Sequence, residues 1–169
     1  MGITRIYLSI TFRVGQSLKK KVAVGESSPF LLIPDNQPAG VSDVISLAQS
    51  GRVTTLTIEI DITHTYIGDL QATVKSPSGK TAILHNKEGW SQDDLKKTYT
   101  SENLPALATL LGEGVAGNWE LHIKDTARKD TGRLNRWSIE AAYESVGDIA
   151  SGEVAPNLAI PLFSLTYAV

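Results

Sequence analysis

The chain has 169 residues, of which 41% are hydrophobic, and a formal net charge of −2. This length suits one domain with a sizeable core, and the near-neutral charge gives no electrostatic case for binding nucleic acid or an anionic membrane. The absence of cysteine excludes a disulfide framework, a thiol nucleophile and a metal site with cysteine ligands. No segment approaches the ~20 apolar residues that span a bilayer, and residues 1–16 lack the pattern of a signal peptide.

The first part of the chain contains several short runs that are typical of β-strands. Arg5–Val14 and Lys20–Val24 alternate between apolar and polar residues, and Gly15–Ser17 between them suits a hairpin turn. Phe30–Ile33 is a short apolar run, and Val41–Leu47 follows as another short strand. We therefore expect this part of the chain to be extended rather than helical.

The middle of the chain carries the clearest alternation. In Val53–Ile62 the even-numbered residues from 56 onwards are apolar, which is the period of a half-buried strand. Gly68-Asp69 forms a turn before a second alternating run, Leu70–Lys75, and a third strand is expected over Thr81–His85. Three strands in succession predict a β-meander.

The second half contains the only candidate helix, over Leu104–Gly112, and two further strands. These strands are Trp119–Asp125 and Leu134–Tyr143. Their alternation turns Trp119 and Trp137 inward, so both rings are expected in the core.

The overall pattern is that of an all-β protein, an antiparallel β-sandwich with little helix. We expect an N-terminal strand extension over residues 1–29, the sandwich over residues 30–143, and a linker with a C-terminal strand over residues 144–169. Asn157–Val169 is apolar enough to require a packing partner, either on this domain or elsewhere.

Several motifs occur together in one order along the chain. They are Ile33–Asn36, Ile62–Leu70, Ser76–Thr81, Gly117–Leu121, Asp125-Thr126 and Asp130–Ser138. In this order they resemble the P domain (Homo B domain) of kexin-like and furin-like proprotein convertases, a module that also follows the catalytic domain of many bacterial secreted subtilases and metalloproteases. The resemblance covers roughly Phe30 to Tyr143.

This resemblance implies a jelly-roll β-sandwich without catalytic residues of its own. In the family the domain packs on a protease domain, supports its folding and tunes its pH and calcium behaviour. The implied partner is therefore an adjacent protease, and the implied location is extracellular. Residues 1–29 and 144–169 depart from the family pattern.

The residues themselves give little support for catalysis. His64, His85 and His122 each lie in or at the end of an expected strand, and no Gly-x-Ser-x-Gly motif or zinc-ligand spacing accompanies them. We interpret His64 as a hydrogen-bonded residue that holds the Gly68-Asp69 turn, and the chain as non-enzymatic. A small hydrolase is disfavoured because a nucleophile and base are missing.

Calcium is the chemical hypothesis that the loops favour most. Asp125 and Asp130 bracket one loop and are the first candidates for ligands, followed by Asp35 and Asp94. Calcium takes six to eight oxygens from carboxylates and carbonyls on such loops. The alternative is that Asp35 and Asp125 form Asx turns and that Asp69 serves its own turn.

Two classes of function remain open. The first is an accessory P domain that stabilises or positions an adjacent secreted protease, with Trp90 in a polar loop as a possible contact. The alternative is a calcium-containing jelly-roll carbohydrate-binding module, for which Trp90, Tyr99 and Tyr66 are the candidate aromatics. The sequence leaves the oligomeric state open.

Overall fold

The computed structural model describes residues 18–146. This part of the chain forms two antiparallel sheets, one short α-helix and one 3-10 turn. Its elements are β1 (Leu18–Ser27), β2 (Leu31–Ile33), β3 (Val41–Leu47), β4 (Arg52–His64), η1 (Ile67–Asp69), β5 (Leu70–Lys75), β6 (Thr81–Asn86), β7 (Leu95–Thr100), α1 (Pro105–Ala108), β8 (Gly117–Asp125) and β9 (Gly132–Val146). Among the described helices, none is long and apolar enough to cross a membrane.

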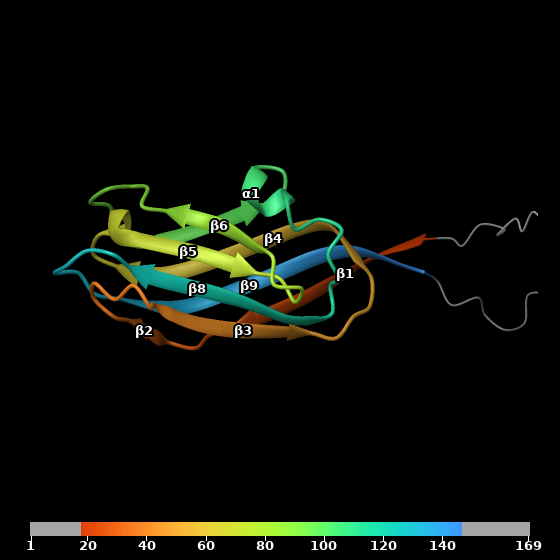
Figure 1. Cartoon of the computed structure of the whole chain (residues 1–169), viewed down its shortest axis with the longest axis horizontal. Helices are drawn as coiled ribbons and strands as arrows, with labels where there is room; N and C mark the ends of the chain where they lie inside the picture. The colour runs from red at the N-terminus through yellow and green to blue at the C-terminus, as the bar shows by residue number, and fades with distance from the viewer. Residues whose placement is uncertain (1–17, 147–169) are drawn as a thin grey trace, which may run out of the picture.

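The sheets have the strand order of a jelly roll. One sheet runs β1-β9-β4-β7, with β2 paired to the beginning of β9, and the other runs β3-β8-β5-β6. Figure 1 shows the second sheet in front of the first, with the strands of both sheets roughly along the long axis of the molecule. The all-β sandwich predicted from alternation is confirmed, and its connectivity is the one that the resemblance implies.

The expected β-meander is wrong. β4 pairs with β7 and β9, whereas β5 pairs with β6 and β8 in the other sheet. Among the strands of residues 18–146, only β5 and β6 are successive in the sequence and pair directly. The alternation of apolar residues identifies a strand with one buried face, but β4 and β5 bury their apolar faces in the same core from opposite sheets. Thr65–Asp69 is therefore a crossover at one end of the sandwich rather than a hairpin turn.

The core between the sheets holds both predicted tryptophans. Trp119 on β8 and Trp137 on β9 are 0% exposed, which confirms the expected inward positions. The indole of Trp137 donates to Asp43 Oδ2 on β3 at 2.7 Å, and the indole of Trp119 donates to the Val115 carbonyl at 3.0 Å. Each buried N–H therefore has a partner, and the Trp137 bond joins the two sheets.

The predicted helix is shorter than expected. Residues 105–108 form α1, which contacts β4, β6 and β7 and lies at the side of the sandwich where β6 and β7 are edge strands. Leu107 and Leu110 are fully buried there. Short apolar segments of this kind close an open side of a sandwich without a further strand.

The two ends of the described chain lie side by side. β1 pairs with β9 from Leu18↔Val146 to Ser27↔Trp137, and β9 continues to Val146. The sandwich therefore includes residues 18–27 and 144–146, which lie outside the range of 30–143 that we expected. The strands expected over residues 5–14 and 157–169 lie outside the described residues.

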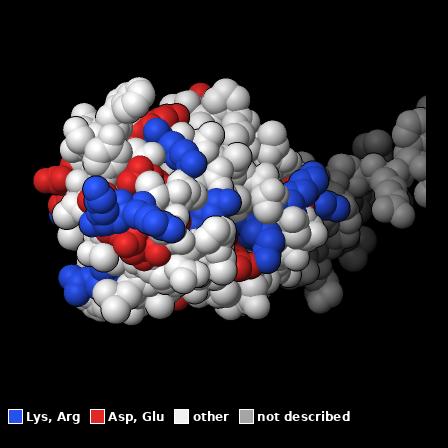
Figure 2. Space-filling model, turned by 60° about the vertical axis from the view of Figure 1, so that its left-hand side comes forward, with Lys and Arg blue, Asp and Glu red and all other residues white. Residues whose placement is uncertain are grey.

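The surface carries charge of both signs. Figure 2 shows lysine and arginine side chains next to aspartate and glutamate side chains across one face of the molecule. On the described surface, ion pairs join different strands: Lys75 with Glu120, Lys96 with Asp61, and Arg136 with both Glu26 and Glu59. Such mixed surfaces give no extended field of one sign.

Candidate functional site

A buried pair of polar residues lies at one end of the sandwich. His64 is the last residue of β4 and Asp125 is the last residue of β8, so the pair joins one sheet to the other. His64 Nε2 lies 3.3 Å from Asp125 Oδ2, and both side chains are 0% exposed. A charged side chain is buried this completely only where its hydrogen bonds are satisfied.

The contacts of the imidazole assign its protons. The backbone N–H of Tyr66 points to His64 Nδ1 at 3.1 Å. A backbone amide can only donate, so Nδ1 accepts, and Nε2 carries the hydrogen that is donated to Asp125. Asp125 Oδ1 in turn accepts from the backbone N–H of Ala127 at 2.9 Å. The pair therefore consists of a neutral imidazole and a carboxylate with a second donor.

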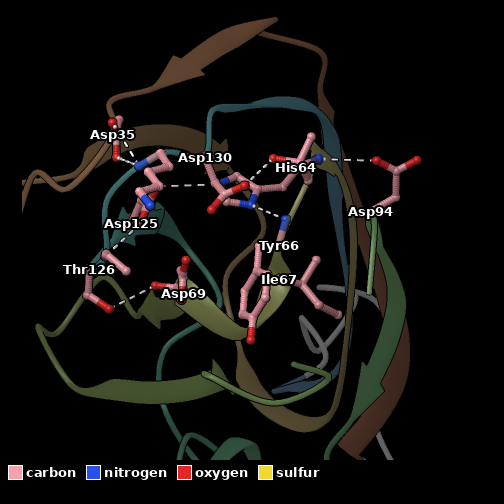
Figure 3. A network of polar contacts seen from close by, with 12 residues as sticks. Asp35, His64, Tyr66, Ile67, Asp69, Asp94, Asp125, Thr126 and Asp130 are labelled. Carbon is pink, nitrogen blue, oxygen red and sulfur yellow. Dashed lines mark hydrogen bonds and ion pairs between the residues drawn. The ribbon is translucent and has the colours of Figure 1, made fainter. Parts of the chain in front are cut away.

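Asp69 ties the crossover turn to the segment after β8. Its backbone carbonyl accepts two hydrogen bonds from Thr126, from N–H at 3.0 Å and from Oγ1 at 2.9 Å. A dashed line in Figure 3 marks the contact between Thr126 and Asp69. Partial burial raises the pKa of the Asp69 carboxyl, and the nearby carboxylates of Asp125 and Asp130 raise it further. The backbone carbonyl of Asp69 thus joins the turn to Thr126, while its carboxyl group lies near other negatively charged side chains.

The other carboxylates at this end of the sandwich accept hydrogen bonds from residues in or next to loops. Asp130 accepts from Thr65 Oγ1 at 2.7 Å, and Asp35 accepts from the Lys129 N–H at 3.1 and 3.3 Å. Asp94 accepts from the backbone N–H of His64 at 3.1 Å. In Figure 3, Asp94 lies on the opposite side of His64 from Asp35 and Asp125.

These positions do not form a metal centre as they stand. Within residues 18–146, no three His, Asp or Glu side chains converge in an arrangement that could hold a metal ion. Calcium needs six to eight oxygens around one point, whereas the buried carboxylate of Asp125 faces an imidazole N–H and a backbone N–H. The donor set therefore does not fit calcium in this conformation, although the four predicted aspartates are grouped at one end.

Trp90 lies in an exposed loop whose backbone is hydrogen-bonded to η1. Its side chain is 81% exposed and its backbone has φ +50°. Gly68 N–H donates to the Trp90 carbonyl at 2.9 Å, and Ile67 N–H donates to the Gln92 carbonyl at 3.0 Å. A Cβ on Gly68 would lie 2.8 Å from Tyr66 Cε1 and 2.9 Å from Trp90 Cα, so only glycine permits this approach.

His85 and His122 have hydrogen-bond partners of their own. His85 is buried with Nε2 at 2.9 Å from the Ile67 carbonyl, and His122 lies beside Ser42 with 3.1 Å between Nδ1 and Oγ. Tyr99 is 2% exposed, so it is not one of the surface aromatics that the carbohydrate-binding alternative requires. Among the described residues, His64 makes polar contacts with Tyr66, Asp94 and Asp125, and none of them is with a serine hydroxyl.

Sequence reasoning found most members of this end but missed how they pair. His64 and Asp125 were assigned separate roles, a turn residue and a metal ligand, because 61 positions separate them. Tyr66 N–H, Thr65 and Thr126 were not singled out as partners. Gly132 was also missed: a Cβ there would lie 2.3 Å from His64 Cδ2. Each of these residues lies in a motif that carries the family resemblance. Membership in such a motif was the signal that could have identified them as part of the site.

Two curated bacterial proteases are similar in sequence to part of this chain. The calcium-dependent protease of Trichormus variabilis is 33% identical over 102 residues, covering 59% of this chain and 15% of that protein. Leupeptin-inactivating enzyme 1 of Streptomyces exfoliatus is 34% identical over 116 residues, covering 68% of this chain and 25% of that protein. The chain thus spans a quarter or less of the length of these curated relatives.

A solved structure shows the same fold. The serine protease of Aeromonas sobria, in a complex with its chaperone, superposes with a TM-score of 0.61 and 16% identity over 76% of this chain and 27% of the protease chain. The sequence profile of the proprotein convertase P-domain matches residues 53–141, from the beginning of β4 into β9. The chain belongs to the proprotein convertase P-domain family.

Proposed function

We propose that this domain is a non-catalytic accessory module that stabilises or positions an adjacent protease domain outside the cell. The observation that carries the proposal is the family match to residues 53–141 together with the small share of each protease relative that the chain covers. Most of each relative lies outside the matched region, so the catalytic domain of those proteases can lie in the unmatched part. A serine protease is the type of partner that the Aeromonas sobria structure suggests.

The contacts of His64 support a structural rather than a catalytic role. A general base needs a free nitrogen that can reach a nucleophile or a substrate. Here Nδ1 accepts from Tyr66 and Nε2 faces Asp125, and the side chain is 0% exposed. The pair has the composition of half a catalytic triad, but it connects β4 to β8 in the way that a buried structural hydrogen bond does.

Trp90 is the contact residue that we propose for the protease domain. Tryptophan contributes strongly to interfaces when its backbone is already fixed, because little conformational entropy is lost on binding. The two hydrogen bonds from η1 to Trp90 and Gln92 fix this loop, and the side chain is 81% exposed. The surface around Trp90 would then be buried by the catalytic domain.

Fusion tests the accessory role. The chain would replace the P-domain region of the calcium-dependent protease of Trichormus variabilis, with the native enzyme and its truncated catalytic domain as references. We expect the fusion to raise the Tm of the catalytic domain above that of the truncated form. An unchanged Tm in the fusion, with the isolated chain itself folded, would argue against an accessory role.

The same fusion separates the role of Trp90 from the role of the domain. We expect Trp90→Ala to leave the Tm of the isolated chain unchanged and to lower the gain in the fusion. Phe30→Ala is a matched control, since Phe30 is also an exposed aromatic at 62% and lies near Arg133 instead. If Trp90→Ala and Phe30→Ala behave alike while the fusion remains stabilised, the contact is wrong and the accessory role stands.

Calcium binding stays a prediction for this chain. Two relatives bear the name calcium-dependent protease, and this name describes those proteins rather than this chain. The arrangement of Asp35, Asp94, Asp125 and Asp130 does not supply a common site in the described residues. A calcium site on these aspartates would require Asp125 to exchange its hydrogen bonds for the ion.

A further inference from the structure

Among residues 18–146, β1 is an edge strand of the larger sheet. Along the described chain it pairs with β9 only, over all ten of its residues. The other side of β1 has no strand partner among residues 18–146. An edge of this length presents a row of backbone N–H and C=O groups that a further strand can pair with.

The outer face of β1 carries two exposed valines between a basic residue and an acidic residue. Val22 and Val24 are 55% and 63% exposed, and they stand between Lys20 on one side and Glu26 on the other. These four residues share one face because side chains alternate along a strand. Read in the opposite direction, the same face presents an acid, two valines and a base.

We propose that two copies of this chain pair antiparallel through their β1 strands, with the two-fold axis at Ala23. In this register Val22 lies opposite Val24 of the second copy. Lys20 lies opposite Glu26 of the second copy, and the symmetry repeats both pairs. The two five-stranded sheets then form one continuous sheet across the dimer, which is an isologous interface.

The side chains select this register among the alternatives. A shift of two residues in one direction places Val24 opposite Lys20, and in the other direction it places Val22 opposite Glu26. Either shift leaves one pair of valines in place of two and loses both charged pairs. A shift of one residue mixes the inner and outer faces of the strand. Directly opposite apolar pairs and opposite charges are the contacts that stabilise antiparallel strands.

On the inner face of β1, Ala23 lies opposite its own copy, and Lys21 lies opposite Gly25 of the second copy. Ile45 Cγ2 already fills the place of a side chain at Gly25, so this position brings no second charge opposite Lys21. Among residues 20–26, no like charges lie directly opposite each other in this register, so Lys20 and Lys21 do not repel across the edge.

The charges around Glu26 favour an incoming lysine. Arg136 pairs with Glu26 at 2.8 Å and with Glu59 at 3.2 Å, so one guanidinium serves two carboxylates. The guanidinium of Arg136 balances one of these two negative charges, so this point of the sheet keeps a net negative charge. Lys20 of the second copy would supply the missing positive charge, and each Lys20 also lies opposite Glu144 of its own sheet.

A charge exchange tests this interface in the 169-residue chain. Molar mass is measured by light scattering and by sedimentation over a range of concentrations, and we expect a species of twice the 18.2 kDa of one chain. Lys20→Glu should raise the dissociation constant on the order of tenfold or more, because it places Glu opposite Glu twice. The same holds for Glu26→Lys. The double variant K20E/E26K restores the opposite charges and should restore the dimer.

Lys96→Glu is the matched control, since Lys96 is an exposed lysine on β7, the other edge of the same sheet. It changes the charge equally and should leave the mass unchanged. A wild-type chain that is monomeric throughout would overturn the proposal. So would a double variant that dissociates as readily as Lys20→Glu, provided that circular dichroism shows both to be folded.

Discussion

His64 and Asp125 face each other at the end of the sandwich, with 3.3 Å between Nε2 and Oδ2 and no exposure of either side chain. The pair joins the last residues of β4 and β8, one from each sheet. Asp125→Ala removes the acceptor for the buried imidazole N–H and for the partly buried N–H of Ala127, which leaves both donors unpaired. We expect a loss of about 3 kcal/mol in the free energy of unfolding, measured by urea denaturation.

Asp130→Ala is the control for this variant, because Asp130 accepts only an exposed contact from Thr65 in the same loop region. Its cost should stay within about 1 kcal/mol. Equal costs for the two variants would contradict a structural role for the buried pair.

Gly68→Ala should destabilise the domain through the Trp90 loop. The added Cβ would lie within 3 Å of Tyr66 Cε1 and of the Trp90 backbone, and backbone atoms cannot move aside cheaply. We expect a cost of about 2 kcal/mol, together with a change in tryptophan fluorescence. Gly114→Ala has no atom within 4 Å of its new Cβ and should melt as the wild type does. If Gly68→Ala is as harmless as Gly114→Ala, the close approach is wrong.

Asp69→Asn should stabilise the domain at neutral pH. Partial burial and the carboxylates of Asp125 and Asp130 raise the pKa of Asp69 in the folded state. A carboxyl with a raised folded pKa stabilises the fold at pH values below its unfolded pKa of about 3.9, and this contribution is lost as the pH rises through the folded value. The ionised group is therefore unfavourable at pH 7, and its removal should gain up to about 0.5 kcal/mol.

The sign can be checked by repeating the melt at lower pH. The gain from Asp69→Asn should shrink as the pH falls toward about 4, because wild-type Asp69 then becomes protonated. Asp93→Asn, at an exposed position of the Trp90 loop, should change the Tm little at any pH. A gain for Asp69→Asn that grows toward low pH would show that the assigned direction is incorrect.

Chelation tests the calcium prediction directly. The four candidate aspartates are hydrogen-bonded to protein groups and do not converge on a point in the described residues. We therefore expect the Tm of the chain to be the same in excess EGTA and in millimolar calcium. A clear rise in Tm with calcium, abolished in Asp125→Asn, would mean that the aspartates rearrange around an ion.

The strands of this fold could be predicted from alternation, and their pairing could not. β3 and β5 have the predicted bounds, because each has one buried face and a turn at either end. The partner of β4 was missed, since an apolar face indicates burial but not which sheet the strand joins. The jelly-roll order came from the resemblance, which carries long-range information that a local pattern lacks.

The candidate site divides in the same way. His64, Asp69 and Asp125 were singled out because each occurs in a recognisable motif, but their contacts depend on segments about 60 residues apart. Trp90 was noted as an aromatic in a polar loop. Its φ of +50° and the hydrogen bond from Gly68 are properties of the folded loop, and no residue type near Trp90 indicates them.

The accessory role is tested most directly by heat inactivation of the protease domain that the chain is fused to. Residual peptidase activity is measured after heating for the catalytic domain alone, for its fusion with this chain and for its fusion with Asp125→Ala. We expect the wild-type fusion to retain activity at temperatures where the catalytic domain alone has lost it, and the Asp125→Ala fusion to lose that protection. Equal inactivation of all three proteins, with the wild-type chain folded, would contradict the proposed function.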